Sequence, residues 1–140
     1  MLQRIVLAGI VLVIGLAACG GAAPNAKQAV SVQVQEFQFQ PATLQVQAGK
    51  PVVLSLKNTG TVDHDWSILE IPTVGEARSS ANPSGHSMEG MAQAPELHVA
   101  VAPGKTGNLE FTPSKAGTYA FYCTVAGHRE SGMAGQLVVQ

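Results

Sequence analysis

Short segments in which apolar and polar residues alternate, with turn signals between them, constrain the fold of this chain more than any other feature. Val30, Val32 and Val34 alternate with polar residues, and a period of two is typical of a strand with one buried face. Further segments of this kind surround Leu54 and Val99, and almost no stretch has a helical period. The pattern predicts an all-β fold, a Greek-key sandwich or barrel of roughly seven or eight antiparallel strands.

Two places depart from this regular pattern. The alternation changes phase at Gln35 and Glu36, so that Phe37 and Phe39 lie on the other parity, which predicts a bulge or a change of sheet. Residues 72 to 96 have neither period and are rich in Ser, Gly, Pro and Ala. We expect a long flap of about 25 residues there, because a passive connection is usually shorter.

The N-terminus has the features of a targeting segment. Arg4 supplies a positive start, residues 5 to 15 form an apolar run too short to span a bilayer, and residues 16 to 19 are Leu-Ala-Ala-Cys. The segment resembles a bacterial lipoprotein leader, which implies cleavage before Cys19 and attachment of lipid to its thiol. The alternative is an ordinary secretory leader with a chance cysteine.

This assignment divides the chain into three parts. Residues 1–18 are the expected signal peptide, residues 19–29 the lipidated cysteine with a flexible tether, and residues 30–140 the folded domain. The lipid would anchor the domain to a bacterial membrane on the extracytoplasmic side, in the periplasm or at the cell surface. The net charge of −1 excludes a basic surface for nucleic acid.

The two cysteines of the chain then have different expected fates. With Cys19 acylated, Cys123 is a single thiol in an oxidising compartment, where a metal-bound or buried thiol is tolerated better than an exposed one. A disulfide between Cys19 and Cys123 is the competing arrangement.

Cys123 is followed by His128 and Met133 within the last strand-loop-strand segment. Histidine and methionine each make up 4 of the 140 residues, so both would follow a cysteine at set offsets by chance only about once in a thousand. A thiolate, an imidazole and a weak axial thioether suit copper, whereas magnesium and calcium prefer oxygen ligands. The spacing therefore predicts most of a copper site.

The missing second imidazole points to His64. A strand is expected from about residue 63 to residue 71, in which His64 shares the parity of Trp66 and Ile68 and so faces the core. Taken alone, an inward imidazole is a hydrogen-bonded core histidine or a metal ligand. The incomplete donor set at Cys123 favours the ligand.

Three other interpretations of Cys123 and its neighbours stay open at this point. A structural zinc site would accept cysteine and histidine, but it usually has more than one thiolate. A buried structural cysteine is common in cores. A nucleophilic cysteine paired with histidine would need an orienting group and an oxyanion hole, which no motif supplies.

His64 followed by Asp65, and the C-x4-H-x4-M run of Cys123, His128 and Met133, resemble the small blue copper proteins. This is the cupredoxin family, which includes plastocyanin and azurin, and the loop spacing is most similar to the auracyanin type over residues 30–140. The resemblance implies one type 1 copper ion with His64, Cys123 and His128 equatorial and Met133 axial. Together with the lipoprotein leader, it leads us to expect a monomeric, membrane-tethered electron carrier, not an enzyme, whose partners are redox proteins of an electron-transport chain in transient contact.

The resemblance also suggests roles around the ligands. Asp65 stands where the family commonly has asparagine, and we expect it to bond to the Thr124 backbone or hydroxyl and join the two ligand segments. The loop sequence itself predicts that the edge of the His128 ring reaches a mostly uncharged surface patch that serves as the electron port, formed by Val125, Ala126, Gly127, Gly132 and Ala134.

The remaining donors allow a second function. His86, Met88 and Met91 lie in the expected flap and would bind Cu(I) or form an adaptable apolar cap, so copper delivery or storage on the same fold is the alternative to electron transfer. His98 is out of phase with the apolar residues beside it and is expected on the surface. An oxidase is disfavoured because one copper set is complete and no further histidine pair is available.

Overall fold

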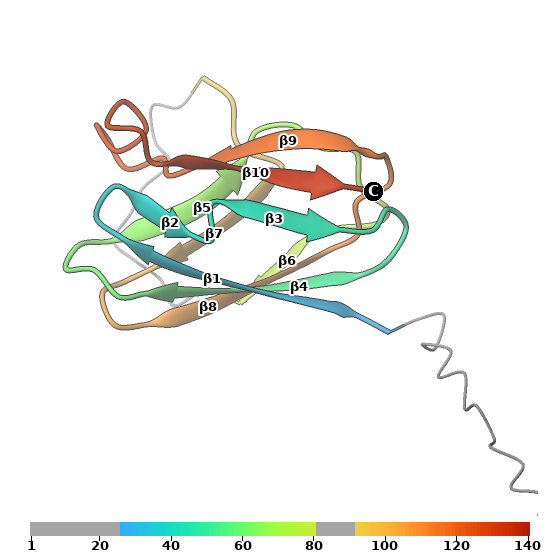
Figure 1. The fold of residues 1–140 in the computed structure, drawn as a ribbon, viewed down its shortest axis with the longest axis horizontal. Helices are drawn as coiled ribbons and strands as arrows, with labels where there is room; N and C mark the ends of the chain where they lie inside the picture. The colour runs from blue at the N-terminus through green and yellow to red at the C-terminus, as the bar shows by residue number, and fades with distance from the viewer. Residues whose placement is uncertain (1–25, 81–91) are drawn as a thin grey trace, which may run out of the picture.

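The computed structural model of the protein describes residues 26 to 80 and 92 to 140. Over these residues the chain forms ten strands and no helix (Figure 1). The strands are β1 (Gln28–Gln35), β2 (Gln38–Gln40), β3 (Thr43–Val46), β4 (Val52–Asn58), β5 (His64–Ile68), β6 (Arg78–Ser80), β7 (Leu97–Val101), β8 (Thr106–Phe111), β9 (Gly117–Tyr122) and β10 (Ala134–Val139).

The strands form two five-stranded sheets that pack face to face. One sheet has the order β2-β1-β4-β8-β6 and the other the order β3-β10-β9-β5-β7. In Figure 1, β1, β4 and β8 run along the lower side of the molecule and β9 and β10 along the upper side. From β3 to β9 each strand lies in the opposite sheet to the one before it. This crossing confirms the predicted all-β sandwich.

The strand pairing is mixed, whereas the sequence predicted antiparallel strands throughout. β1 pairs with β4 in parallel, and β3 pairs with β10 in parallel. In both parallel pairs the chain between the two partner strands passes through the opposite sheet. The two partners therefore run in the same direction. The strand count also exceeds the predicted seven or eight, because two short strands, β2 and β6, lie where the sequence predicted a bulge and a flap.

The phase change at Gln35 and Glu36 is a hairpin turn. β1 and β2 are antiparallel neighbours in the same sheet, with Gln35 opposite Gln38, so Glu36 and Phe37 form a two-residue turn. The predicted bulge or change of sheet is therefore wrong. A turn reverses the chain and restarts the alternation, which gives the same phase shift in the sequence as a bulge does.

Part of the expected flap is ordered in the sheet. Residues 78 to 80 form β6, which pairs with β8. His86, Met88 and Met91 lie outside the described residues, as do the leader and Cys19. The described part of the chain contains no helix of the length and apolarity needed to cross a membrane.

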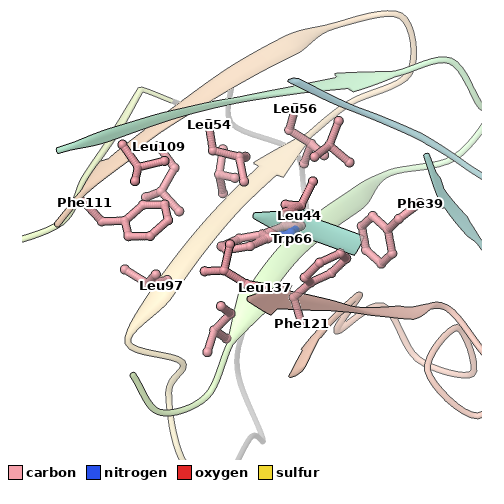
Figure 2. Close-up of a cluster of buried hydrophobic side chains, with 14 of the residues drawn as sticks. Phe39, Leu44, Leu54, Leu56, Trp66, Leu97, Leu109, Phe111, Phe121 and Leu137 are labelled. Carbon is pink, nitrogen blue, oxygen red and sulfur yellow. The ribbon is translucent and has the colours of Figure 1, made fainter. Parts of the chain in front are cut away.

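The core lies between the sheets and contains the aromatic side chains that the alternation predicted as inward-facing. Trp66 is fully buried, with its ring centroid 5.3 Å from that of Phe121 and 6.2 Å from that of Phe111. Phe39 meets Phe121 edge-on at 5.1 Å. Figure 2 shows these rings among Leu44, Leu54, Leu56, Leu97, Leu109 and Leu137. Each large side chain buried in this way contributes roughly 1.5 to 3 kcal/mol through its transfer from water.

The topology brings distant ligand candidates to one end of the sandwich. β5 begins at His64 and runs antiparallel to β9, which ends at Tyr122. The start of one antiparallel strand lies beside the end of its neighbour, so His64 comes close to Cys123. β10 begins at Ala134, opposite Tyr122. The loop between β9 and β10 therefore closes over the same end, at the left in Figure 1.

Candidate metal centre

Cys123 lies directly after β9, and its side chain is fully buried. Tyr119, Phe121 and Cys123 share one parity, and Phe121 is also fully buried, so the pleat directs the thiol inward as predicted. Cys123 is a free cysteine. Cys19 lies outside the described residues, so the competing disulfide stays an alternative.

The loop from Cys123 to Met133 is folded by its own backbone hydrogen bonds. The Cys123 N–H donates to the Met133 carbonyl over 3.2 Å, and the Met133 N–H donates to the His128 carbonyl over 3.0 Å. Gly127 and Gly132 have φ values of 81° and 91°, which favour glycine over other residues. These bonds fix the three donor residues of the loop relative to one another.

His64 enters the site from the other ligand segment. It is the first residue of β5 and is fully buried, like Trp66 and Ile68 on the same strand. All five residues of β5 are buried, so it is the proximity of the His64 ring to Cys123 that agrees with the direction predicted from parity. Its Nδ1 is 3.9 Å from the Cys123 sulfur.

The three strong donors converge on one point. Ligand atoms of His64, Cys123 and His128 all lie within 4.8 Å of one another, and the His128 Nδ1 is 3.5 Å from the Cys123 sulfur. The two imidazole centroids are 5.0 Å apart. Metal bonds of about 2.0 to 2.3 Å in a trigonal arrangement separate neighbouring ligand atoms by roughly 3.5 to 4 Å, so the spacing suits a single metal ion.

The fourth predicted donor, Met133, lies in the same loop as Cys123 and His128. Its side chain is fully buried, and its backbone is bonded to both Cys123 and His128. One thiolate, two imidazoles and a nearby thioether form the ligand set of blue copper sites, whereas structural zinc sites usually have more thiolates and no thioether.

The state of the His64 imidazole also fits a metal site. Burial and the nearby charge of His128 lower the pKa of His64, so the ring is neutral at neutral pH and has a lone pair to donate. Its Nε2 is buried and has no hydrogen-bond partner in the described part of the chain. Its Nδ1 lies 3.9 Å from the Cys123 sulfur and is the ring nitrogen placed to bind a metal, which favours the ligand over the core histidine.

Asp65 joins the two ligand segments, as predicted. Its carboxylate accepts hydrogen bonds from the Thr124 N–H over 3.0 and 3.1 Å and from the Thr124 hydroxyl over 2.6 Å. The Cys123 sulfur lies 3.9 Å from the same carboxylate. Asp65 is fully buried, and such bonds are much stronger when the acceptor is charged.

The network continues along β5 to His98, where the prediction of a surface histidine needs correction. The buried hydroxyl of Ser67 donates to Asp65 over 2.8 Å, and its oxygen lies 2.9 Å from the His98 Nδ1. His98 differs in burial from Leu97 and Val99, as its parity predicts, but it is half-buried. Its position opposite Ser67 on the neighbouring strand was not evident before the strand register was known.

Sequence reasoning also missed two contacts around His128. The Arg129 guanidinium lies 4.1 Å from the centre of the Tyr122 ring, which links the residue after His128 to the residue before Cys123. The Phe37 ring meets the His128 ring edge-on at 5.3 Å. The only signal for Phe37 was the break in alternation before it.

The comparisons with known proteins identify the family. The model of the cupredoxin-like domain matches residues 7–139, which is most of the chain. The chain therefore belongs to the cupredoxin family, and its fold and donor set define it as a blue copper protein.

Named relatives fall into two groups. Auracyanin-A of Chloroflexus aurantiacus is 31% identical over 146 residues, which cover 89% of this chain and 88% of the relative. The copper-resistant cuproprotein CopI of Rubrivivax gelatinosus is 31% identical over 121 residues, which cover 86% of this chain and 71% of the relative.

A solved structure of auracyanin A, a blue copper protein of Chloroflexus aurantiacus, has the same fold. It matches with a TM-score of 0.63 and 23% sequence identity, over 82% of this chain and 100% of that chain. The cofactor of this chain is one copper ion, of the type 1 class that its donor set suits.

We predict that Asp65→Ala weakens both the fold and the metal site. Buried donors on Thr124 and Ser67 lose their acceptor, at a cost of roughly 2 to 4 kcal/mol in the free energy of unfolding, and copper affinity falls about 10- to 100-fold. Asp65→Asn keeps an acceptor oxygen and should lose much less. Urea unfolding of the metal-free protein and competition with a copper chelator measure the two effects. Wild-type values for Asp65→Ala would contradict this role.

We also predict that copper binding releases the proton of Cys123. Burial and the charge of Asp65 raise the pKa of Cys123 from 9.0 to about 11, so the thiol is protonated at neutral pH and must lose that proton to bind metal. Apparent copper affinity should therefore rise about tenfold per pH unit from this group. An indicator dye in weak buffer measures the released proton, which Cys123→Ser should eliminate.

The same pKa shift affects the metal-free fold. Between about pH 9 and pH 11 the folded thiol keeps its proton while the unfolded thiol loses it. The stability of the metal-free protein should therefore fall as the pH rises through this range, and Cys123→Ser should lack this part of the decrease.

Proposed function

We propose that this protein is an electron carrier in which His64, Cys123, His128 and Met133 bind the copper ion. The observation that carries the proposal is the convergence of three strong donor atoms within 4.8 Å at the end of a sandwich. When bound, copper supplies a one-electron couple between Cu(I) and Cu(II). The similarity to auracyanin A, a blue copper protein, supports a carrier in preference to an enzyme.

The residues around the donors keep the site similar in both oxidation states. Cys123 and Met133 are held by backbone bonds within one loop, and Asp65 ties this loop to the strand of His64. Both His64 and Met133 are fully buried. Ligands fixed in this way rearrange little when the charge of the site changes, which favours fast electron exchange.

His128 is the proposed exit for the electron. Its ring is half-buried, and Ala126 and Gly127 beside it are exposed while Val125 is half-buried. Residues 125 to 127 are uncharged, whereas Arg129 and Glu130 on the other side of His128 in the sequence are charged and exposed. The uncharged part allows close approach of another redox protein in a small, transient contact. We propose that the protein works as a monomer and exchanges electrons with redox proteins of an electron-transport chain.

The membrane tether rests on the sequence of the N-terminus. Residues 1–18 are the proposed signal peptide, Cys19 carries the lipid, and residues 19–29 connect it to the domain of residues 30–140. This arrangement holds the domain at a bacterial membrane on the extracytoplasmic side. The mass of the mature N-terminal peptide tests it, and an unmodified N-terminus would refute the lipid anchor.

Copper delivery or storage is the second candidate, and the similarity to the copper-resistant cuproprotein CopI favours it. Such a protein would pass the metal to another molecule and would lose it readily. Rapid transfer of Cu(I) to a metal-free acceptor, slowed by Met88→Ala, would support delivery. Slow metal loss together with fast electron exchange would support the carrier.

We predict that addition of Cu(II) to the purified metal-free domain produces an intense visible band. The band arises from charge transfer between the Cys123 thiolate and the metal, so Cys123→Ser should abolish it. Absorption spectroscopy of both proteins is the measurement. A colourless wild-type protein, or a band that survives in Cys123→Ser, would overturn the proposed function.

We further predict that Val125→Glu slows electron exchange without loss of the visible band. The added charge lies beside His128 and disfavours close approach of an uncharged partner surface. The rate of electron exchange between Cu(I) and Cu(II) forms of the protein, measured by NMR line broadening, should fall at low salt. Val74→Glu introduces the same single charge at an exposed apolar residue whose backbone is bonded to Thr112 at the other end of the sandwich, and it is the control. Equal rates for wild type and Val125→Glu would contradict this port.

A further inference from the structure

Phe37 has a backbone conformation that its residue type disfavours. It is the second residue of the turn between β1 and β2, and its φ of 61° makes it the one non-glycine residue with positive φ in the described part of the chain. Glycine or asparagine is preferred at such a position, and a bulky residue there costs roughly 1 to 3 kcal/mol.

Burial in the core does not account for this strained phenylalanine. The side chain of Phe37 is 48% exposed, whereas Phe39 on the next strand is 6% exposed. An exposed aromatic residue in a strained turn lowers both stability and solubility. Strain of this kind persists where the surroundings maintain it, and it is often found at functional sites.

The contact that Phe37 makes is with a metal ligand candidate. Its ring meets the His128 imidazole edge-on, with centroids 5.3 Å apart and an interplanar angle of 73°. The other neighbours of that imidazole are the His64 ring at 5.0 Å and the Cys123 sulfur at 3.5 Å from its Nδ1. Phe37 is thus a contact of the half-buried ring that comes from outside the ligand loop.

The turn itself is anchored to the segment that leads into His64. The Glu36 carboxylate accepts hydrogen bonds from the Thr61 N–H and, over 2.8 Å, from the Thr61 hydroxyl. The Thr59 N–H donates to the carbonyl of Val34 at the end of β1 over 2.8 Å. These contacts hold the turn at the metal end, where Figure 1 shows it beside the loop between β4 and β5.

We propose that Phe37 is a positioning residue of the metal centre, which fixes the His128 imidazole from outside the ligand loop. The turn between β1 and β2 thus braces both imidazoles, through Glu36 beside the His64 segment and through Phe37 against His128. The inference rests on the proposed function, because it assigns His128 to the copper site. On this view, the unfavourable backbone conformation of Phe37 is offset by the function of its contact with the His128 ring.

Three variants separate this role from a general effect on stability. Phe37→Gly removes the ring and relieves the backbone strain, so the thermal midpoint of the metal-free protein should stay close to the wild-type value. Phe37→Leu keeps an apolar side chain without the aromatic edge, and Phe37→Trp keeps an aromatic ring. Val74→Ala, which shortens another exposed apolar residue outside the site, is the matched control.

The first readout needs no copper. In the metal-free protein, the NMR signals of the His128 ring carbons and protons should move in Phe37→Gly and Phe37→Leu, and the ring should become more mobile. Phe37→Trp and Val74→Ala should leave the mobility unchanged. If Phe37→Gly leaves the His128 ring signals and their relaxation as in wild type, the proposal is wrong.

The second readout is the rate of copper loss to a chelator, followed by the visible band. We expect it to rise about tenfold in Phe37→Gly and Phe37→Leu, as for other residues that orient metal ligands, and to stay within about twofold in Phe37→Trp and Val74→Ala. Equal rates in wild type and Phe37→Gly would overturn the proposal. A wild-type protein without the band would refute the copper carrier, while the metal-free NMR measurement would still decide the role of Phe37.

Discussion

The side chain of Asp65 accepts hydrogen bonds from the backbone and the hydroxyl of Thr124, and this contact joins two segments that are 59 positions apart in the sequence. One segment carries His64 and the other carries the remaining donors. The Asp65 side of the contact is fully buried and Thr124 is half-buried, so water competes less than at the surface and charged hydrogen bonds are stronger. The direct pairing between β5 and β9 is limited to Ser67 opposite Tyr122, so the Asp65 contact adds a second direct link between the two ligand segments.

Much of this arrangement could be predicted from the sequence because it depends on parity. Alternation along single strands placed His64 and Cys123 on inward faces, and both side chains are fully buried. The ligand loop is local, so its donor spacing was visible in the sequence. The contact of Asp65 with Thr124 was predicted from the family resemblance, since strand alternation alone does not determine which residues meet across a sheet.

The features that escaped prediction depend on contacts between remote segments. The turn at Glu36 and Phe37 gave the same phase shift as a bulge, and only the pairing of β1 with β2 distinguishes the two. Phe37 contacts His128, and Glu36 contacts Thr61. Both contacts join the turn between β1 and β2 to loops that are remote in the sequence. The parallel pairing of β1 with β4 could not be predicted either. Alternation shows which face of a strand is buried, but not the direction of its neighbour.

Trp66 adds a property that concerns the core and not the ligands. It is the single tryptophan of the chain, its ring is fully shielded from solvent, and its indole N–H has no acceptor among the described residues. An excited indole lowers its energy by reorienting polar neighbours, and here it has few to reorient. Its fluorescence should therefore lie at the short-wavelength limit for tryptophan. Exposure of Trp66 to solvent on unfolding should shift this emission maximum to longer wavelength. The emission maximum therefore reports unfolding of the core independently of the visible copper band.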